Sequence, residues 1–243
     1  SPEVAAQLMR DGAALGGEER EVTVLFADLR GFTTLSEQLP PPELLALLNR
    51  YLDRMSGAIE AHGGVIDKFI GDAIMALFGA PVLQDAPADR ALAAALAMER
   101  ALVSLNAELA AEGRPPLAIG VGVNTARVVA GNIGSHRRLN YSVIGDGVNV
   151  AARLQSETRH AERAHPLAPG AAPRRRTCSV RGGGVTGAAR LQSETRKPEH
   201  AANIITSAAT LAALNDAKKF SLRPLGLAQV KGRAEAVEIF SVG

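Results

Sequence analysis

The sequence is poor in cysteine and in aromatic residues. One cysteine, Cys178, stands among 243 residues, tryptophan is absent, and aromatic residues make up 3% of the chain. A single cysteine excludes an internal disulfide and a cysteine-cluster metal site, and it fits a reducing compartment. Because 47% of the residues are hydrophobic and 21% are charged, the chain has the balance of a soluble globular domain. Its core is therefore expected to be aliphatic and rich in alanine.

Long apolar stretches are also lacking. The longest weakly charged ones, Ile74–Leu83 and Ala91–Met98, are far shorter than the roughly 20 residues that cross a bilayer. We find no signal peptide, and the first residue is Ser1 rather than methionine. We therefore expect a cytoplasmic domain, either free-standing or the cytoplasmic part of a larger membrane-anchored protein, in which residues 1–19 lead in from an upstream region that carries the sensor.

Two familiar signatures of phosphate and metal sites are missing. No GxxxxGK[ST] motif occurs, which excludes a P-loop, and the five histidines are not spaced as zinc ligands. The glycine-rich stretches near Gly131 and Gly182–Gly184 lack the strand and helix context of a dinucleotide-binding loop. Carboxylates and isolated basic residues remain as the candidates for chemistry.

The basic charge of the chain is concentrated in one segment. Residues 160–196 carry seven arginines against two glutamates, a net charge of +5, so the rest of the chain is −3 although the total is +2. The segment ends in a repeat, because AARLQSETR at Ala151–Arg159 returns at Ala188–Arg196. Its Pro/Gly/Arg-rich sequence shows no helix or strand periodicity and is predicted to be a disordered, duplicated insert. This charge pattern argues against a general nucleic-acid-binding face.

The remaining sequence alternates strands and helices. This pattern predicts an α/β sandwich, an α+β arrangement with helices packed on one sheet. Strands are expected at 22–27, 65–69, 73–78, 117–124, 128–133, 139–144, 203–205, 220–224 and 237–242, and helices at 42–62, 88–112, 145–154 and 207–214. Gly71 and Asp72 are expected to form a hairpin turn, and Ser207 is expected to cap a helix.

Two carboxylates occupy positions that suit metal ligands. Asp28 ends an apolar strand, and Asp72 lies in the tight turn between two apolar strands. Hard divalent cations such as Mg²⁺ take one or two carboxylates together with substrate phosphates. The pattern fits that arrangement, and it fits equally well a structural role in which Asp72 forms a turn and Asp28 caps a strand.

Three basic residues are candidates for phosphate contacts, namely Arg127, Arg153 and Lys231. Arginine suits bidentate phosphate binding, whereas lysine acts as a point charge. Each of them alone is more commonly a solvated surface charge. Asn149 and Arg153 are four residues apart on a predicted helix, so they share one face of it.

Four long motifs follow one another along the chain. They are REVTVLFADLRGFT (20–33), GGVIDKFIGDAIMALFGAP (63–81), GVGVNTARVVAGNIGS (120–135) and NYSVIGDGVNVAARL (140–154). In this order they resemble the catalytic domain of class III nucleotide cyclases, the adenylate/guanylate cyclase family, in its bacterial adenylate cyclase form. The resemblance covers residues 20–243 apart from the insert, and it implies a ferredoxin-like βαββαβ core sheet with helices packed on it.

The resemblance implies a metal site and a base site. Asp28 and Asp72 match the two aspartates that bind two Mg²⁺ or Mn²⁺ ions per site in this family. Lys68 matches the lysine that reads adenine, and Ser142 stands where its partner is an aspartate, threonine or serine. Because guanylate-specific members carry an acidic residue in place of the lysine, Lys68 favours ATP over GTP.

The resemblance also implies how the reaction is catalysed. Asn149 and Arg153 match the pair that stabilises the transition state, and Arg127 and Lys231 match phosphate-binding residues. The implied enzyme converts ATP to 3′,5′-cyclic AMP and pyrophosphate by two-metal-ion catalysis, in cyclic-nucleotide signal transduction. Family members build each site from two subunits, so the implied assembly is a head-to-tail homodimer with shared active sites.

Two features depart from the family pattern. Ala126 stands where the family usually has glycine, which would perturb the turn before Arg127 if that position needs a positive φ. The insert follows directly after the helix that bears Asn149. We expect the first copy of the repeat to keep its place and the insert to loop out, because closure entropy grows slowly with loop length. The alternative is that the second copy takes the helical position and abolishes activity.

Two rival functions remain open at this point. One is a catalytically silent, cyclase-like module for dimerisation or nucleotide sensing, disabled by the insert. The other is a nucleic-acid-binding α/β domain, which the charge distribution disfavours. The insert itself has a simpler explanation as a retained intron or a sequence-assembly artefact.

Overall fold

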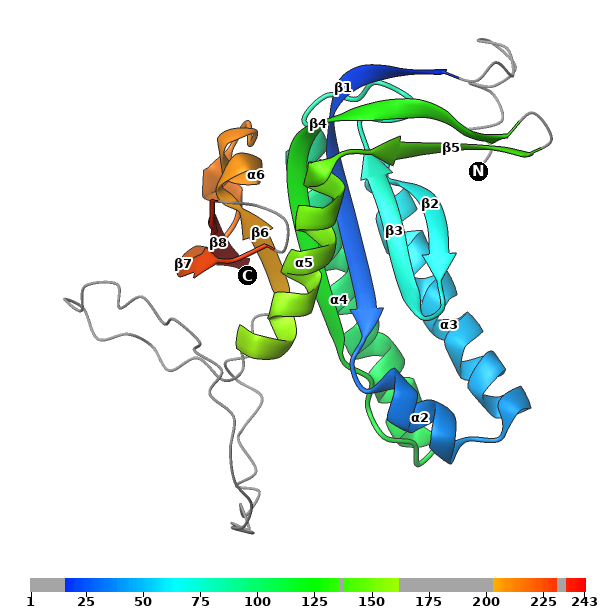
Figure 1. Ribbon diagram of the computed structural model, residues 1–243. Coiled ribbons are helices and arrows are strands. Elements are labelled where there is room, and N and C mark those ends of the chain that lie inside the picture. Colours follow the sequence, from blue (N-terminus) through cyan, green and yellow to red (C-terminus); the bar gives the residue numbers. More distant parts are fainter. Residues whose placement is uncertain (1–15, 136–137, 162–202, 231–234) are drawn as a thin grey trace, which may run out of the picture.

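The computed structural model describes residues 16–135, 138–161, 203–230 and 235–243 (Figure 1). Strands and helices alternate along these ranges, as the sequence predicted. In chain order the elements are β1 (Gly16–Leu29), α2 (Phe32–Gln38), α3 (Pro41–Glu60), β2 (Val65–Ile70), β3 (Ala73–Phe78), α4 (Pro87–Ala111), β4 (Ile119–Ser135), β5 (Arg138–Ile144), α5 (Asp146–Ala161), β6 (Ile204–Ser207), α6 (Ala208–Ala212), the 3₁₀ turn η2 (Ala217–Lys219), β7 (Leu222–Ala228) and β8 (Val237–Val242).

One sheet organises the described part of the chain. Its strand order is β2-β3-β1-β4-β6-β8-β7, and β5 pairs with β4 beside this path. The pairs β2/β3, β3/β1 and β1/β4 are antiparallel, whereas β4/β6 is parallel. The run β1-α3-β2-β3-α4-β4 therefore has the ferredoxin-like order, which confirms the predicted fold class.

The two faces of the sheet bury different residues of the same strand. Leu25 and Ala27 of β1 join a core made with α3 and α4. Val22 and Val24 join a second core on the opposite face, where Ala151 of α5 packs. Successive strand residues point to opposite faces, so this alternation follows from the period of β1. Figure 1 shows the resulting layers, with α5 on one side of the sheet and α4 on the other.

Helix α3 contributes a single apolar stripe to the core. Its buried residues are Leu47, Tyr51, Met55 and Ile59, each four positions after the last. This spacing keeps the four side chains on one face of a helix of 3.6 residues per turn. The stripe packs against α4 and the sheet, and it brings Tyr51 close to Asp28 and Asp72.

Two glycines of β4 let α5 lie unusually close to the sheet. A Cβ added at Gly122 would collide with the backbone N of Gln155 and the carbonyl oxygen of Ala151. A Cβ at Gly120 would collide with the hydroxyl of Thr158. Both collisions involve α5, so the absence of side chains at these two positions sets the distance at which that helix packs.

Strand β4 differs from the prediction of two separate strands at 117–124 and 128–133. It is continuous from Ile119 to Ser135. The polar residue Thr125 in the expected gap is buried, and its hydroxyl lies 2.9 Å from that of Thr23 on β1. Ala126 pairs with Val22 in the same ladder. In the described ranges Ala86 is the one non-glycine residue with positive φ, so the φ angle of Ala126 is not positive. Position 126 therefore does not require glycine.

Other boundaries differ from the sequence analysis at particular places. Helix α2 was not predicted, and β1 begins at Gly16, inside the segment expected to be a lead-in. The predicted cap at Ser207 is confirmed, because its hydroxyl accepts a hydrogen bond from the N–H of Thr210.

The first copy of the repeat, Ala151–Arg159, lies within α5. This is the arrangement that the sequence analysis favoured over displacement by the second copy. The second copy, with residues 162–202, lies outside the described residues. None of the helices in the described ranges combines the length and the hydropathy that a membrane-spanning helix needs.

Candidate active site

Asp28 and Asp72 lie next to each other at the C-terminal end of β1, a central strand of the sheet. Asp72 lies in the turn between β2 and β3. Gly71 before it has φ +64°, a left-handed conformation that glycine adopts without strain. The Oδ2 atom of Asp72 accepts a hydrogen bond from the backbone N–H of Leu29, 3.2 Å away. The side chains of the two aspartates also hydrogen-bond to each other. The structure thus brings together the two residues predicted to bind metal.

This pairing changes the acidity of one carboxyl. Burial, the hydrogen bond to Asp28 and the negative charge of Asp28 raise the pKa of Asp72 to about 7. Near neutral pH the pair therefore competes for a proton, and a divalent cation could take its place. Two oxygen-donating carboxylates fit Mg²⁺ or Mn²⁺ with substrate phosphates completing the shell. In the part of the chain that the structure describes, no three or more His, Cys, Asp or Glu side chains are grouped so that they could hold a metal ion by themselves.

Tyr51 is a neighbour of this pair that the sequence analysis did not identify. Its ring is fully buried, and burial together with the charges of Asp28 and Asp72 raises the pKa of its phenol. Within the described ranges its hydroxyl oxygen has no hydrogen-bond partner. A tyrosine on an apolar helix stripe gives no sequence signal for such a position, because the contact depends on how α3 packs on the sheet.

A second group of residues lies on β2 and β5. Nζ of Lys68 lies 3.3 Å from the hydroxyl oxygen of Ser142, so the two residues predicted to read the base are adjacent. A third residue, Asp67, joins them: its Oδ2 accepts the hydroxyl of Ser142 at 2.9 Å and forms an ion pair with Lys68 at 3.1 Å. Asp67 was not among the predicted site residues, although a carboxylate inside the apolar strand VIDKFI is a usable signal.

A bulge in β2 explains how two consecutive residues reach the same hydroxyl. The register of β2 against β3 shifts between Ile66 and Lys68, so Asp67 is the extra residue. A bulge breaks the strict alternation of strand side chains. The Asp67 side chain is 1% exposed, whereas that of Lys68 is 46% exposed. The carboxylate is therefore the buried base of this group, and the lysine is its accessible end.

The predicted catalytic pair lies on the exposed side of α5. Asn149 and Arg153 are both exposed, while Val150, Ala151 and Leu154 between and beside them are buried. Nε of Arg153 lies 3.0 Å from Oε1 of Glu157, one turn further along. Both side chains are thus presented to solvent, at the surface of this chain, by a helix whose other face is fixed in the core.

Of the two predicted phosphate-binding residues, the structure describes Arg127 and not Lys231. Arg127 lies on β4, and its Nε is 3.2 Å from Oε1 of Glu19 on β1, with both side chains more than 60% exposed. Such an exposed pair is weak and leaves the guanidinium accessible. Lys231 lies outside the described residues. Arg127 lies on β4, and Asn149 and Arg153 lie on α5, whereas Asp28 and Asp72 lie at the end of β1 and in the β2–β3 turn.

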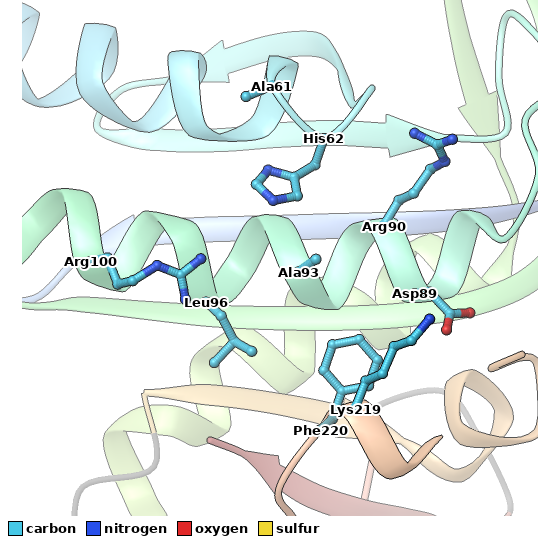
Figure 2. A pocket seen from close by; sticks show the side chains of 9 residues that line it. All are labelled: Ala61, His62, Asp89, Arg90, Ala93, Leu96, Arg100, Lys219 and Phe220. Carbon is cyan, nitrogen blue, oxygen red and sulfur yellow. The ribbon is translucent and has the colours of Figure 1, made fainter. Parts of the chain in front are cut away.

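A pocket on the helical side of the molecule is not part of this arrangement. It has a volume of about 430 Å³ and lies where the end of α3, α4 and the residues around η2 meet (Figure 2). Its lining residues are Ala61, His62, Asp89, Arg90, Ala93, Leu96, Arg100, Lys219 and Phe220. None of the predicted site residues is among them. The chemistry is therefore expected at the strand ends and on α5 rather than in this hollow.

Comparison with known proteins identifies the family. Residues 17–163 match the family described as the adenylate and guanylate cyclase catalytic domain. The chain belongs to this family. The resemblance and the fold predicted from the four motifs are thereby confirmed, as is the enzyme class at the level of the family.

Curated relatives and solved structures agree with this assignment. The chain is 32% identical to adenylate cyclase 1 of Rhizobium meliloti over 98% of its length, and 34% identical to an adenylate cyclase of Anabaena cylindrica over 92%. It spans only 31% and 37% of those two proteins. The crystal structure of the adenylyl cyclase CyaB from P. aeruginosa has a TM-score of 0.72 and 32% identity, covering 94% of this chain and 96% of that one.

A guanylyl cyclase is equally similar to the chain. The crystal structure of the guanylyl cyclase Cya2 has a TM-score of 0.70 and 35% identity, covering 94% of both chains. Overall similarity therefore identifies a cyclase catalytic domain and does not distinguish the two purine nucleotides. The choice between them rests on the few side chains that would face the base.

Proposed function

We propose that this domain is an adenylate cyclase that converts ATP to 3′,5′-cyclic AMP and pyrophosphate. The observation that carries the substrate choice is the Lys68–Ser142 contact of 3.3 Å. Lysine has N–H donors only, which suit the N1 acceptor of adenine and oppose the N1–H donor of guanine. The hydroxyl of Ser142 lies beside it, in reach of the neighbouring 6-position.

The reaction requires stabilisation of developing negative charge. The ribose 3′ oxygen forms a bond to the α phosphorus, the bond to the pyrophosphate oxygen breaks, and the 3′-hydroxyl proton is released. Asp28 and Asp72 would hold Mg²⁺ or Mn²⁺, whose charge stabilises the attacking and leaving oxygens when bound. Arg153 and Asn149 would donate hydrogen bonds to the phosphoryl group as it becomes more negative. Arg127 and Lys231 would bind the triphosphate.

The assembly that we propose is a head-to-tail homodimer with shared sites. Its support is the division of site residues on one chain: Asp28 and Asp72 lie together in a strand-end cluster, whereas Asn149 and Arg153 stand on the solvent face of α5. A second copy could bring its α5 to the aspartates of the first. Two-fold pairing would then build two equivalent sites.

Two proteins test the proposed activity directly. The full chain and a variant lacking residues 160–196 are incubated with ATP and Mn²⁺, and cyclic AMP is measured across a range of protein concentrations. We expect the variant to be active, with a specific activity that rises with concentration if the sites are shared. Asp28→Asn should eliminate product from both proteins.

The outcomes separate the competing functions. Cyclic GMP from GTP, without cyclic AMP from ATP, would overturn the substrate choice. No product from either protein at high concentration would overturn the enzymatic function in favour of a silent dimerisation or nucleotide-sensing module. Activity in the deletion variant alone would identify the insert as inhibitory.

A further inference from the structure

The Asp67–Ser142–Lys68 group contains one carboxylate, which is buried and contacts the other two side chains. Asp67 is the buried member, with 1% of its side chain exposed, and it contacts both of the residues expected to face the base. It lies at the bulge of β2, and its carboxylate contacts Ser142 on β5. The hydrogen-bond donors and acceptors of the three side chains define the role of this carboxylate.

A serine hydroxyl has one hydrogen to donate and two lone pairs that accept. An ionised carboxylate only accepts, so the 2.9 Å contact with Asp67 uses the single hydrogen of Ser142. One lone pair of the same oxygen accepts from Lys68 at 3.3 Å. The remaining lone pair can therefore only accept a hydrogen bond from whatever lies in front of it.

The same carboxylate limits what Lys68 offers. An ammonium group has three N–H donors. One is directed to Asp67 at 3.1 Å and one to Ser142 at 3.3 Å. Within the described part of the chain this leaves one donor of Lys68 for a ligand, next to one acceptor of Ser142. A neighbouring donor and acceptor in this order match the N1 acceptor and the 6-amino donor of adenine.

We propose that Asp67 is a positioning residue that fixes the Ser142 hydroxyl as a hydrogen-bond acceptor and thereby sets selectivity for a 6-aminopurine. This inference rests on the proposed adenylate cyclase function. Without the carboxylate, the hydroxyl could rotate and donate its hydrogen to a 6-oxo group. A serine hydroxyl alone can thus bind either a 6-amino or a 6-oxo group. Its hydrogen bond to Asp67 leaves it able only to accept, which favours the 6-amino group.

The test compares ATP with purine riboside triphosphate, which lacks the 6-amino group and keeps the N1 acceptor. Any effect on Lys68 alters both substrates and cancels in the ratio of their kcat/KM values. Asp67→Asn keeps the shape of the side chain, but its amide can donate to Ser142 and reverse the hydroxyl. We expect the ratio of kcat/KM for ATP to kcat/KM for purine riboside triphosphate to fall about tenfold in this variant of the chain, since the loss of a buried acceptor for the substrate amine is strongly discriminating.

A double-mutant comparison isolates the path through Ser142. In a Ser142→Ala background, Asp67→Asn should change the ratio by less than about twofold, because the hydroxyl that it acts on is gone. Asp53→Asn on the exposed surface of α3 is the matched control and should leave the ratio unchanged. Inosine triphosphate, a 6-oxo substrate, should gain relative to ATP in Asp67→Asn.

The results distinguish this inference from the function on which it rests. If neither the full chain nor the variant lacking residues 160–196 makes cyclic AMP, the proposed function is defeated. An active wild type in which Asp67→Asn lowers kcat/KM equally for all three nucleotides gives Asp67 a merely structural role and overturns the inference. An undiminished effect of Asp67→Asn in the Ser142→Ala background would also overturn it, because the carboxylate would then act by another route.

Discussion

The backbone N–H of Leu29 donates a hydrogen bond to Oδ2 of Asp72 across 3.2 Å. This contact ties the β2–β3 turn to the last residue of β1, so the side chains of Asp28 and Asp72 are held together by the backbone before any ligand arrives. The repulsion between the two carboxylates is relieved by the proton that their hydrogen bond implies. Preorganisation of the pair therefore has a cost that depends on pH.

The first prediction concerns that pH dependence. The pKa of Asp72 lies at about 7, above its usual 3.8. The folded protein holds a proton that the unfolded chain loses, so the stabilisation is complete below the unfolded pKa and is lost as pH rises toward 7. With a chelator present to remove divalent cations, the melting temperature should therefore fall as the pH rises from about 4 to about 7. Asp72→Asn should remove most of this fall, measured by differential scanning fluorimetry.

The control for this experiment is Asp53→Asn, which changes an exposed aspartate on α3. It should keep the wild-type slope of melting temperature against pH. Addition of Mn²⁺ at the upper end of the range should restore stability to the wild type and not to Asp72→Asn, because bound cations stabilise the state that binds them. An unchanged slope in Asp72→Asn would show that the pair does not hold the proton.

Tyr51→Phe is the second prediction. The Tyr51 hydroxyl is buried and has no hydrogen-bond partner in the described ranges, so its removal relieves a desolvation cost. The free energy of unfolding should stay the same or rise by up to about 1 kcal/mol, measured by urea denaturation. Thr210→Val provides the contrast, because Thr210 Oγ1 accepts the buried N–H of Thr125 at 2.9 Å. That variant should lose about 1–3 kcal/mol.

Destabilisation by Tyr51→Phe of the same size as Thr210→Val would contradict this account. It would mean that the Tyr51 hydroxyl makes a hydrogen bond, for example through a water molecule to the nearby carboxylates. Each of the two variants removes one buried hydroxyl oxygen, so the difference between their unfolding free energies reports whether that oxygen was hydrogen-bonded.

The third prediction is that Gly122→Ala loosens α5. An added methyl group would meet the backbone of Gln155 and Ala151, and backbone atoms cannot rotate away as a side-chain end can. We expect a loss of about 1–3 kcal/mol in unfolding free energy. Because Asn149 and Arg153 stand on the same helix, kcat should fall as well, while discrimination between purines should be preserved.

Gly57→Ala serves as the comparison for that substitution. Gly57 lies inside α3, and a Cβ there meets nothing within 4 Å. Alanine in this helical position should stabilise the protein by about 0.5–1 kcal/mol. If both variants shift stability in the same direction, the close approach of α5 to β4 is not what Gly122 secures.

The fourth prediction tests the shared site. Asp28→Ala and Arg153→Ala should each be inactive, since each removes one half of both sites. Mixed in equal amounts and allowed to exchange, they should recover about a quarter of wild-type activity, because half of the dimers are hybrids with one intact site. Cyclic AMP formation after mixing is the measurement. Absence of recovery, with exchange demonstrated, would contradict the head-to-tail arrangement.

The sequence allowed most elements to be predicted where the local pattern was strong. The strand at 237–242 was predicted with the observed bounds, and α3 and α4 were correct to within two residues. Helix α2 was missed because Gly31 at its N-terminus provides no side-chain cap and none of its seven residues is fully buried. A short helix without cap or stripe leaves no local signal.

Non-local contacts explain the remaining differences. The polar gap predicted around Thr125 is filled in the fold by Thr23, 102 positions away, so the strand continues. Asp67 likewise takes its meaning from Ser142, which is 75 positions away. Two pairs of residues carried over from the family motifs are adjacent in the structure, Asp28 with Asp72 and Lys68 with Ser142. The roles of these residues remain predictions.

Strand β4 has a consequence for how this domain can change. Along its 17 residues it pairs with β1, β5 and β6, and it carries the glycines on which α5 rests. A single-residue insertion there would turn every following side chain to the opposite face. Ser142 would then shift relative to Lys68, and the side chain of Arg127 would turn to the opposite face at the same time. Substitutions that change base selectivity are therefore expected on β2 or β5, because a change in the length of β4 would disturb its pairing with three strands at once.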